Sequence, residues 1–270
     1  MKLMKKSEAR CFGGEQAYYQ HLSQRCGAMT FGVFTPPKPK KVVYVLAGLE
    51  CNEQAFATKA GSQRVAAELG LVLVTPDTSP RSQRYPGDDA SWDFGIGAGF
   101  YVDATKAPWS EAYQMHSYVA DELPTLIEGE LGFGGLSRGI MGHSMGGHGA
   151  LVIAFNHVGR YASVSALAPI CAPSEVPWGV KAFTNFFGSD KTAWAKYDAT
   201  KLVAAGKRVP SIRIDQGMSD KFLDVQLRPE LFAAACNAAG QQLTLERHVG
   251  YDHGYYFIAT VVEAQLRHHA

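Results

Sequence analysis

The sequence predicts an α/β protein, with a single domain over residues 1–270, a mostly parallel central sheet and helices on both faces. Short apolar runs of strand length alternate along the chain with longer stretches of helical character, as in folds built on parallel sheets. Near the middle of the chain, a glycine-rich turn joins one such run to a helical stretch. The chain has no internal repeat and no low-complexity tract, and 270 residues suit one large α/β domain.

The first part of the chain predicts a βαβ unit. After a β-rich start at Met29–Phe34, the apolar run Val42–Leu46 predicts a buried strand. A helix over Phe56–Glu68 and a second buried strand over Leu71–Thr75 complete the unit. The following residues, Asp77–Ser110, are crowded with Pro, Gly, Asp and Trp and show no clear period. They predict a long loop, and loops of this length in compact domains are usually functional.

The rest of the chain continues the alternation. A helix is expected at Tyr113–Glu128, and the apolar step Gly139–Met141 leads through the glycine turn into a helical run at His148–Asn156. Three further strands, Ser163–Leu167, Ser211–Asp215 and Leu243–Arg247, alternate with helical runs at Ala199–Ala205, Pro229–Ala239 and Tyr255–Leu266.

Composition excludes several classes of protein. Lys and Arg number 26 and Asp and Glu 25, so the net charge of +1 offers no footprint for nucleic acid or an anionic membrane. No apolar run approaches the roughly 20 residues of a membrane-spanning helix, and the N-terminus lacks the apolar stretch of a signal peptide. The five cysteines are scattered and form no CxxC pair, which predicts neither disulfides nor a zinc site. These features favour a reducing, cytoplasmic setting.

The segment Gly142–Gly146 matches Gly-x-Ser-x-Gly, the pattern of a nucleophile elbow centred on Ser144. In an elbow, the serine sits on a strained turn between a strand and a helix, and the glycines avoid collisions that a Cβ would cause. The bare pattern is common, and its position between an expected strand and an expected helix makes it specific. Ser144 is therefore the candidate nucleophile.

A serine nucleophile needs a histidine base and an acid, which in this class of site follow it in the order Ser, acid, His. Six of the nine histidines are excluded because they precede the serine, lie in or just after the elbow, or close the chain: His21, His116, His143, His148, His268 and His269. The remaining candidates are His157, His248 and His253. His253 lies in the loop before the last expected helix, and we take it as the base. Asp220, in the turn after the strand Ser211–Asp215, is the candidate acid. Asp215 still belongs to the strand, and Asp224, one turn further on, is held in reserve.

The developing oxyanion should be held by two backbone amides. We expect them to be those of Met145, directly after the nucleophile, and Leu49, in the glycine turn after the strand Val42–Leu46. Cys51 lies two residues beyond Leu49, and we expect it either to border the mouth of the site or to be a small buried apolar residue.

Two other patterns do not predict sites. Gly95–Gly99 reads GxGxG, without the spacing or the preceding strand of a dinucleotide-binding turn. His143 and His148 are five residues apart, so they cannot share a helix face as a metal-binding pair does. No metal and no cofactor are expected.

Seven segments of the chain resemble the S-formylglutathione hydrolase (esterase D) family of the α/β-hydrolase superfamily. They are Leu46–Asn52, Pro76–Arg81, Ser91–Ala104, Gly142–Ala150, Ala166–Pro173, Asp215–Leu223 and Gly250–Thr260, and they span nearly the whole chain. The closing residues 267–270 also resemble the natural end of the family. Two departures, Glu50 in place of a frequent threonine and the loop Arg81–Gly87, lie near the expected mouth of the site.

The resemblance implies hydrolysis of S-formylglutathione to formate and glutathione, a step of formaldehyde detoxification, without metal or organic cofactor. It places the triad on Ser144, Asp220 and His253, and implies a cytoplasmic enzyme that is commonly a homodimer. Trp92 and Trp178 are expected near the acyl or glutathione site, with a role in the core as the alternative. A general short-chain carboxylesterase or an acyltransferase would use the same triad, and a non-catalytic binding protein of this fold is a further alternative.

Overall fold

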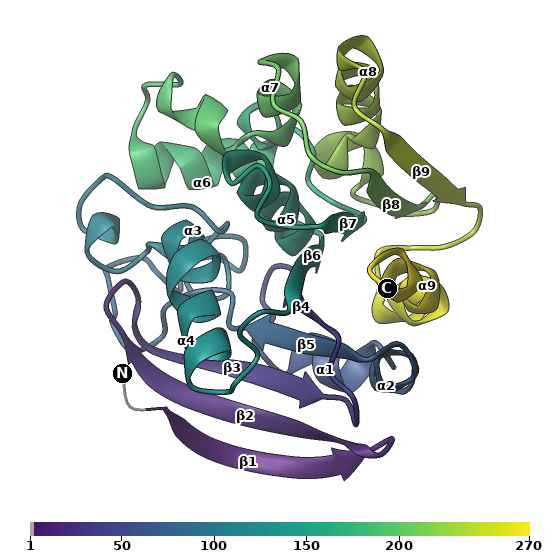
Figure 1. The fold of residues 1–270 in the computed structure, drawn as a ribbon. Helices are drawn as coiled ribbons and strands as arrows, with labels where there is room; N and C mark the ends of the chain where they lie inside the picture. Colours follow the sequence, from purple (N-terminus) through teal and green to yellow (C-terminus); the bar gives the residue numbers. More distant parts are fainter. Residues whose placement is uncertain (1–2) are drawn as a thin grey trace.

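A nine-stranded sheet with helices on both faces forms the computed structural model, which describes residues 3–270 (Figure 1). The strand order is β1-β2-β3-β5-β4-β6-β7-β8-β9. All pairs from β5 through β9 are parallel, whereas β1, β2 and β3 form an antiparallel extension at one edge. The predicted α/β class and the mostly parallel sheet are confirmed.

The strands are β1 Met4–Cys11, β2 Gly14–Ser23, β3 Gly27–Thr35, β4 Lys41–Leu46, β5 Leu71–Pro76, β6 Ser137–His143, β7 Ser163–Leu167, β8 Ile212–Gly217 and β9 Leu243–His248. The helices are α1 Ala55–Lys59, α2 Gln63–Leu69, α3 Met115–Ser117, α4 Leu123–Gly129, α5 Met145–Asn156, α6 Pro177–Phe187, α7 Ala199–Ala204, α8 Pro229–Ala239 and α9 Tyr255–His268. Short 3₁₀ turns occur at Trp109–Glu111, Pro173–Glu175 and Ala193–Tyr197, and π-helical turns at Tyr118–Glu122 and Leu223–Leu227.

Most elements match the predictions; one expectation is wrong, and three elements were not foreseen. The single helix expected over Phe56–Glu68 is two short helices, because Gly61 adopts a left-handed φ of 67° between α1 and α2. Strands β1 and β2 were not foreseen, since β1 is an exposed edge strand of mostly polar residues. Helix α6 was also missed. The long loop after β5 is confirmed, apart from the 3₁₀ turn at Trp109–Glu111.

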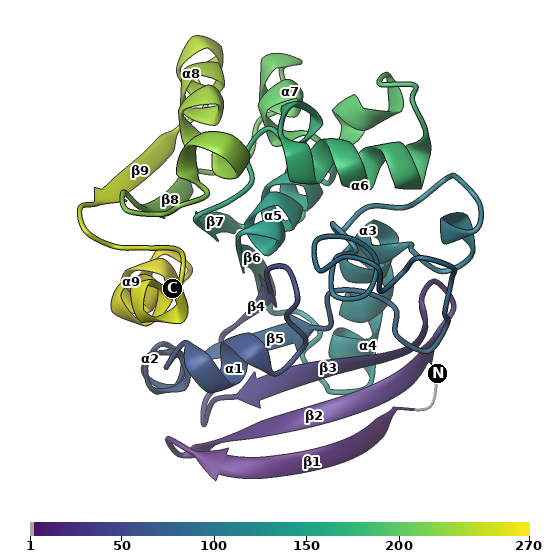
Figure 2. The same cartoon turned by 180° about the vertical axis from the view of Figure 1, so that it is seen from behind.

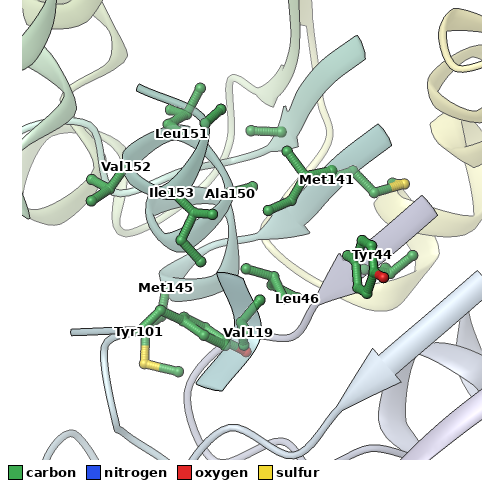
Figure 3. Close-up of a cluster of buried hydrophobic side chains, with 14 of the residues drawn as sticks. Tyr44, Leu46, Tyr101, Val119, Met141, Met145, Ala150, Leu151, Val152 and Ile153 are labelled. Carbon is green, nitrogen blue, oxygen red and sulfur yellow. The ribbon is translucent and has the colours of Figure 1, made fainter. Parts of the chain in front are cut away.

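The helices divide between the two faces of the sheet. Figures 1 and 2 show α1, α2 and α9 on one face, and α4, α5, α7 and α8 on the other. Helix α5 is almost wholly buried against β4, β6 and β7, so its side chains form the centre of the core. Figure 3 shows Leu151 and Ile153 of this helix in one buried cluster with Met141 of β6 and Leu46 of β4. Among residues 3–270, no helix is long and apolar enough to cross a membrane.

The end of α9 is anchored in the sheet. The ring of His269 is buried between the hydroxyls of Ser163 and Ser165 on β7, at 2.7 and 2.8 Å from its two nitrogens. His268 Nε2 lies 3.0 Å from the carbonyl oxygen of Val164. These closing histidines therefore belong to the fold, and they hold α9, which follows the loop of His253, against the sheet.

The parallel direction of β4, β6, β8 and β9 decides where a site can form. Their carboxyl ends meet at one edge of the sheet, so the loops that follow them lie close together. These loops begin at Ala47, Ser144, Met218 and Val249. The predicted triad and oxyanion residues each follow one of these four strands, whereas Trp92 and Trp178 follow β5 and β7.

Candidate active site

Ser144 stands at the sharp turn between β6 and α5. Its backbone has φ 58° and ψ −117°, a strained conformation that residues other than glycine rarely adopt. An added Cβ at Gly142 would lie 2.1 Å from the carbonyl oxygen of Gly146, and one at Gly146 would lie 2.0 Å from that of Leu46. Both glycines of the motif are thus required by close backbone packing, and the turn has the geometry of a nucleophile elbow.

His253 and Asp220 form a hydrogen-bonded pair in the loops after β9 and β8. Asp220 Oδ2 lies 2.5 Å from His253 Nδ1, and Asp220 Oδ1 accepts a hydrogen bond of 2.8 Å from the amide of Phe222. The Asp220 side chain is buried, whereas His253 is partly exposed. This arrangement leaves Nε2 of His253 as the nitrogen available for proton transfer.

The other candidate acids and bases lie elsewhere. Asp224 is exposed in the π-helical turn after Phe222, so the structure does not place this reserve acid at His253. Asp215 is fully buried in β8 and binds His248 Nε2 at 2.7 Å, Arg213 and Gln265, which makes a second His–Asp pair inside the fold. His157 caps the end of α5, and its Nε2 lies 3.2 Å from Nε2 of His116.

A cavity of about 450 Å³ brings the candidate residues together, and its volume falls in the range of small-molecule sites. Its wall is formed by Gly48, Leu49, Glu50, Cys51, Trp92, His143, Ser144, Trp178, Lys221, Phe222 and His253. Within the described residues, no hydrogen bond links the Ser144 hydroxyl to His253. Such bonds are often long in unliganded sites and tighten when substrate binds.

The turn after β4 faces the elbow. An added Cβ at Gly48 would lie 3.2 Å from Cβ of Ser144, so the two backbones approach closely. Within residues 3–270, neither the amide of Leu49 nor that of Met145 has a hydrogen-bond acceptor. Met145 is the first residue of α5, where the helix dipole favours negative charge. These two amides are therefore free to hold an oxyanion beside Ser144.

The long loop after β5 holds this turn in place. Gly97 accepts a hydrogen bond of 3.0 Å from the amide of Glu50, and its own amide donates to Ser79 Oγ at 2.8 Å. The carbonyl oxygen of Cys51 accepts bonds from Thr78 Oγ1 at 2.5 Å and Arg81 Nη2 at 2.9 Å. The GxGxG segment is thus a supporting loop, as expected.

The loop Arg81–Gly87 does not line the cavity. We expected this departure from the family pattern to lie near the mouth, but in the described chain none of its residues lines the cavity wall. Arg81 acts indirectly, through Cys51, and Arg84 instead pairs with the buried Asp88 and the exposed Asp89.

Aromatic side chains form one wall of the cavity. Trp92 and Trp178 meet edge to face, with ring centroids 5.3 Å apart, and Phe222 lies 4.7 Å from Trp178. Lys181 on α6 holds the loop of Trp92, because its Nζ donates to Ser91 Oγ at 2.7 Å. Trp92 is 48% exposed, so it lies at the mouth of the cavity rather than in the core. Trp178 is only 6% exposed and belongs both to the cavity wall and to the hydrophobic core.

Buried His143 packs against the base, His253. Its ring is buried, with its centroid 4.6 Å from that of His253, and its Nε2 lies 3.2 Å from the carbonyl oxygen of His253. Burial, with a smaller contribution from His253, lowers the pKa of His143 well below its ordinary value. A neutral ring with its proton on Nε2 donates to that carbonyl and adds no positive charge beside His253.

Cys51 lines the cavity, which agrees with the first of the two expectations for it, a place at the border of the site. It is partly buried, and its Sγ lies 3.9 Å from the hydroxyl oxygen of Tyr255. Burial is the main cause that raises the pKa of the thiol, and the nearby Glu50 adds only a small further rise.

Sequence reasoning did not single out four residues of the cavity wall: Gly48 as a contact of the nucleophile, His143, Lys221 and Phe222. Lys221 and Phe222 directly follow Asp220, so their place after a strand end was the available signal. Within residues 3–270, no group of three or more His, Cys, Asp or Glu side chains is arranged to hold a metal ion.

Comparisons with known proteins agree with this geometry. The family model Esterase, described as "Putative esterase", matches residues 25–268. A mouse S-formylglutathione hydrolase is 48% identical over 278 aligned positions, which cover 100% of this chain and 98% of the mouse protein. The structure of an Agrobacterium tumefaciens S-formylglutathione hydrolase superposes with a TM-score of 0.94 at 45% identity, covering 98% of each chain.

A more distant structure shares only the fold. A fluorophosphonate-binding serine hydrolase of Staphylococcus aureus has a TM-score of 0.73 at 17% identity, over 94% of this chain and 97% of that one. The fold and these matches define an esterase of the α/β-hydrolase class. Within that class, the chain belongs to the S-formylglutathione hydrolase family, as the resemblance in the sequence predicted.

Proposed function

We propose that this protein hydrolyses S-formylglutathione to formate and glutathione through a formyl-serine intermediate. One observation carries the proposal: Ser144, His253 and the turn of Leu49 line a single cavity, and Asp220 holds the far nitrogen of His253. Two relatives at 48% and 45% identity bear the name of this activity, which supports the choice of substrate.

In the first half-reaction, Ser144 Oγ attacks the formyl carbon while His253 Nε2 takes the proton of the hydroxyl. Asp220 stabilises the imidazolium that forms, and the amides of Leu49 and Met145 hydrogen-bond the oxyanion of the tetrahedral intermediate. The C–S bond then breaks, and His253 returns the proton to the departing sulfur. A thiol of pKa about 8.5 is a good leaving group, so the demand on His253 as an acid is modest.

The second half-reaction releases the acyl group. Water attacks the formyl carbon and gives a proton to His253, and the same two amides hold the new oxyanion. The bond from carbon to Ser144 Oγ breaks, the serine recovers its proton from His253, and formic acid leaves and ionises. No cofactor takes part in these steps.

The setting of the enzyme is part of the proposal. We place it in the cytoplasm as a homodimer, in the second stage of glutathione-dependent formaldehyde detoxification. The family resemblance supports the dimer, and all five cysteines being free supports a reducing compartment. Sedimentation of the purified protein tests the dimer.

Ser144→Ala tests the chemistry. The substitution should leave the melting temperature nearly unchanged and remove almost all turnover, since loss of a triad residue can lower kcat by about 10⁶. The assay is release of glutathione from S-formylglutathione, with aryl esters and other thioesters compared by kcat/KM. Residual activity above a few per cent would contradict the assignment of Ser144, and preference for an aryl ester would favour a general carboxylesterase.

A further inference from the structure

Two charged side chains of opposite sign line the cavity without an ion partner. Glu50 lies in the turn after β4 and Lys221 in the loop after β8, and both side chains are exposed. Among residues 3–270, neither forms a salt bridge, either with the other or with a third residue. Lys221 Nζ is instead 4.9 Å from the ring centroid of Phe222, in the aromatic wall. The cavity thus presents one anion and one cation to whatever fills it.

The backbone keeps Glu50 in place at the mouth. Its φ of 63° is left-handed, a conformation that favours glycine, and its amide is held by the carbonyl oxygen of Gly97 at 3.0 Å. An added Cβ at Gly97 would lie 3.1 Å from Cα of Glu50, so the two segments are in close contact. The carboxylate of Glu50 therefore projects from a firmly positioned turn.

Most other charged residues close to the site already have partners. Arg81 pairs with Asp77 at 2.7 Å, and Lys181 pairs with Asp93 at 2.6 Å. Lys59 lies over the ring of Tyr255, 5.3 Å from its centroid. A ligand that carries both charges can satisfy Glu50 and Lys221 together, whereas a purely anionic thiol carrier would be repelled by Glu50.

We propose that Glu50 and Lys221 select the thiol carrier: Glu50 binds its ammonium group and Lys221 binds a carboxylate. This inference rests on the proposed function, because the glutathionyl group carries one ammonium and two carboxylates. The ammonium and one carboxylate belong to its γ-glutamyl residue, and the second carboxylate to its glycine. Recognition takes place away from the reacting carbon, so it contributes to binding of the ground state and the transition state alike.

The experiment compares KM and kcat of Glu50→Gln and Lys221→Gln with those of the wild type on two substrates. S-formylglutathione carries the charges, and S-formyl-N-acetylcysteamine presents the same thioester on a neutral carrier. Each variant should raise KM for S-formylglutathione roughly two- to fivefold with kcat nearly unchanged, the pattern of lost uniform binding. On the neutral carrier, neither variant should differ from the wild type.

Two charged analogues identify the partners. With N-acetylated S-formylglutathione, which lacks the ammonium, Glu50→Gln should no longer raise KM. With the glycine amide, the effect of Lys221→Gln should vanish if Lys221 binds the glycine carboxylate, and it should persist if it binds the γ-glutamyl one. Lys221→Arg, which keeps the positive charge, should have the wild-type KM for S-formylglutathione. Loss of the Glu50 effect only with the amide would overturn the assignment of partners.

Matched controls separate recognition from net charge. Glu130→Gln and Lys106→Gln make the same changes of charge at exposed positions outside the cavity and should leave KM unchanged. The inference is overturned if the cavity variants raise KM equally on the neutral carrier, or if the controls match them. A wild type that cleaves the neutral carrier but not S-formylglutathione would instead overturn the proposed function.

Discussion

Two buried aspartates each hold a histidine 33 residues further along the chain, and we expect their asparagine variants to fail in opposite ways. Asp220 binds His253 Nδ1 at 2.5 Å beside the cavity, while Asp215 binds His248 Nε2 at 2.7 Å within the sheet. If the first pair serves catalysis and the second serves stability, activity and stability should separate cleanly between Asp220→Asn and Asp215→Asn.

The loss in Asp220→Asn follows from hydrogen bonds in the structure. The amide of Phe222 donates to Oδ1, so an asparagine keeps its oxygen there and turns its NH₂ group toward His253 Nδ1. Nδ1 must then accept, which moves the ring proton to Nε2, the nitrogen that should take the proton of Ser144. A fixed wrong tautomer lowers kcat by up to about 10⁴, or about 5 kcal/mol, with little effect on stability.

The loss in Asp215→Asn is a loss of stability. The carboxylate of Asp215 is fully buried and accepts bonds from Arg213 Nε at 2.7 Å and Nη2 at 2.8 Å, from His248, and from Gln265 at 2.6 Å. An amide donor cannot serve all of them and leaves the guanidinium without its counter-charge. Breaking a buried pair costs about 3–5 kcal/mol, which should lower the melting temperature by roughly 6–20 °C.

The assay combines kcat on S-formylglutathione with thermal unfolding followed by circular dichroism. Asp224→Asn is the matched control, because Asp224 is exposed and one turn beyond Asp220; it should match the wild type in both measurements. The reasoning is refuted if folded Asp220→Asn retains more than a few per cent of wild-type kcat. It is also refuted if folded Asp215→Asn loses turnover by 10³ or more, as a catalytic acid would.

Three further predictions concern the pocket, a thiol and a buried histidine. Turnover of p-nitrophenyl esters should fall steeply from formate to butyrate, because overpacking a small acyl site costs roughly 1–3 kcal/mol; a maximum at butyrate or longer would contradict this. Iodoacetamide should inactivate the wild type slowly, and faster at higher pH, because burial raises the pKa of Cys51, whereas Cys51→Ala should stay active and resist; equal inactivation of both would exclude Cys51 as the target. Burial lowers the pKa of His148 to about 4, so between pH 6.5 and pH 4 this histidine is protonated in the unfolded chain and neutral in the folded chain. The free energy of unfolding should therefore fall by up to about 1.4 kcal/mol per pH unit between pH 6.5 and pH 4 on account of this residue, and urea titrations should show His148→Gln less sensitive over that range; parallel curves would contradict it.

Local patterns along the chain were enough to predict the elbow and the order of the triad. A strand, a Gly-x-Ser-x-Gly turn and a helix place Ser144 by steric rules that act within a few residues, since Gly142 and Gly146 leave no room for a Cβ. The class of fold followed from alternating apolar runs, because a strand buried on both faces must be apolar throughout. Elements without such a signal, above all the polar edge strand β1, were missed.

By itself, the sequence determined the fold class, the elbow and the family, because these depend on short-range sterics and on motifs contiguous in the chain. Only the tertiary structure shows which side chains meet: Asp220, which the sequence favoured over Asp224, is hydrogen-bonded to His253, whereas Asp224 is exposed. It also decided that Glu50 and Lys221 share a cavity. These residues are joined by packing between loops from distant strands, and no pattern along the chain records which loops meet.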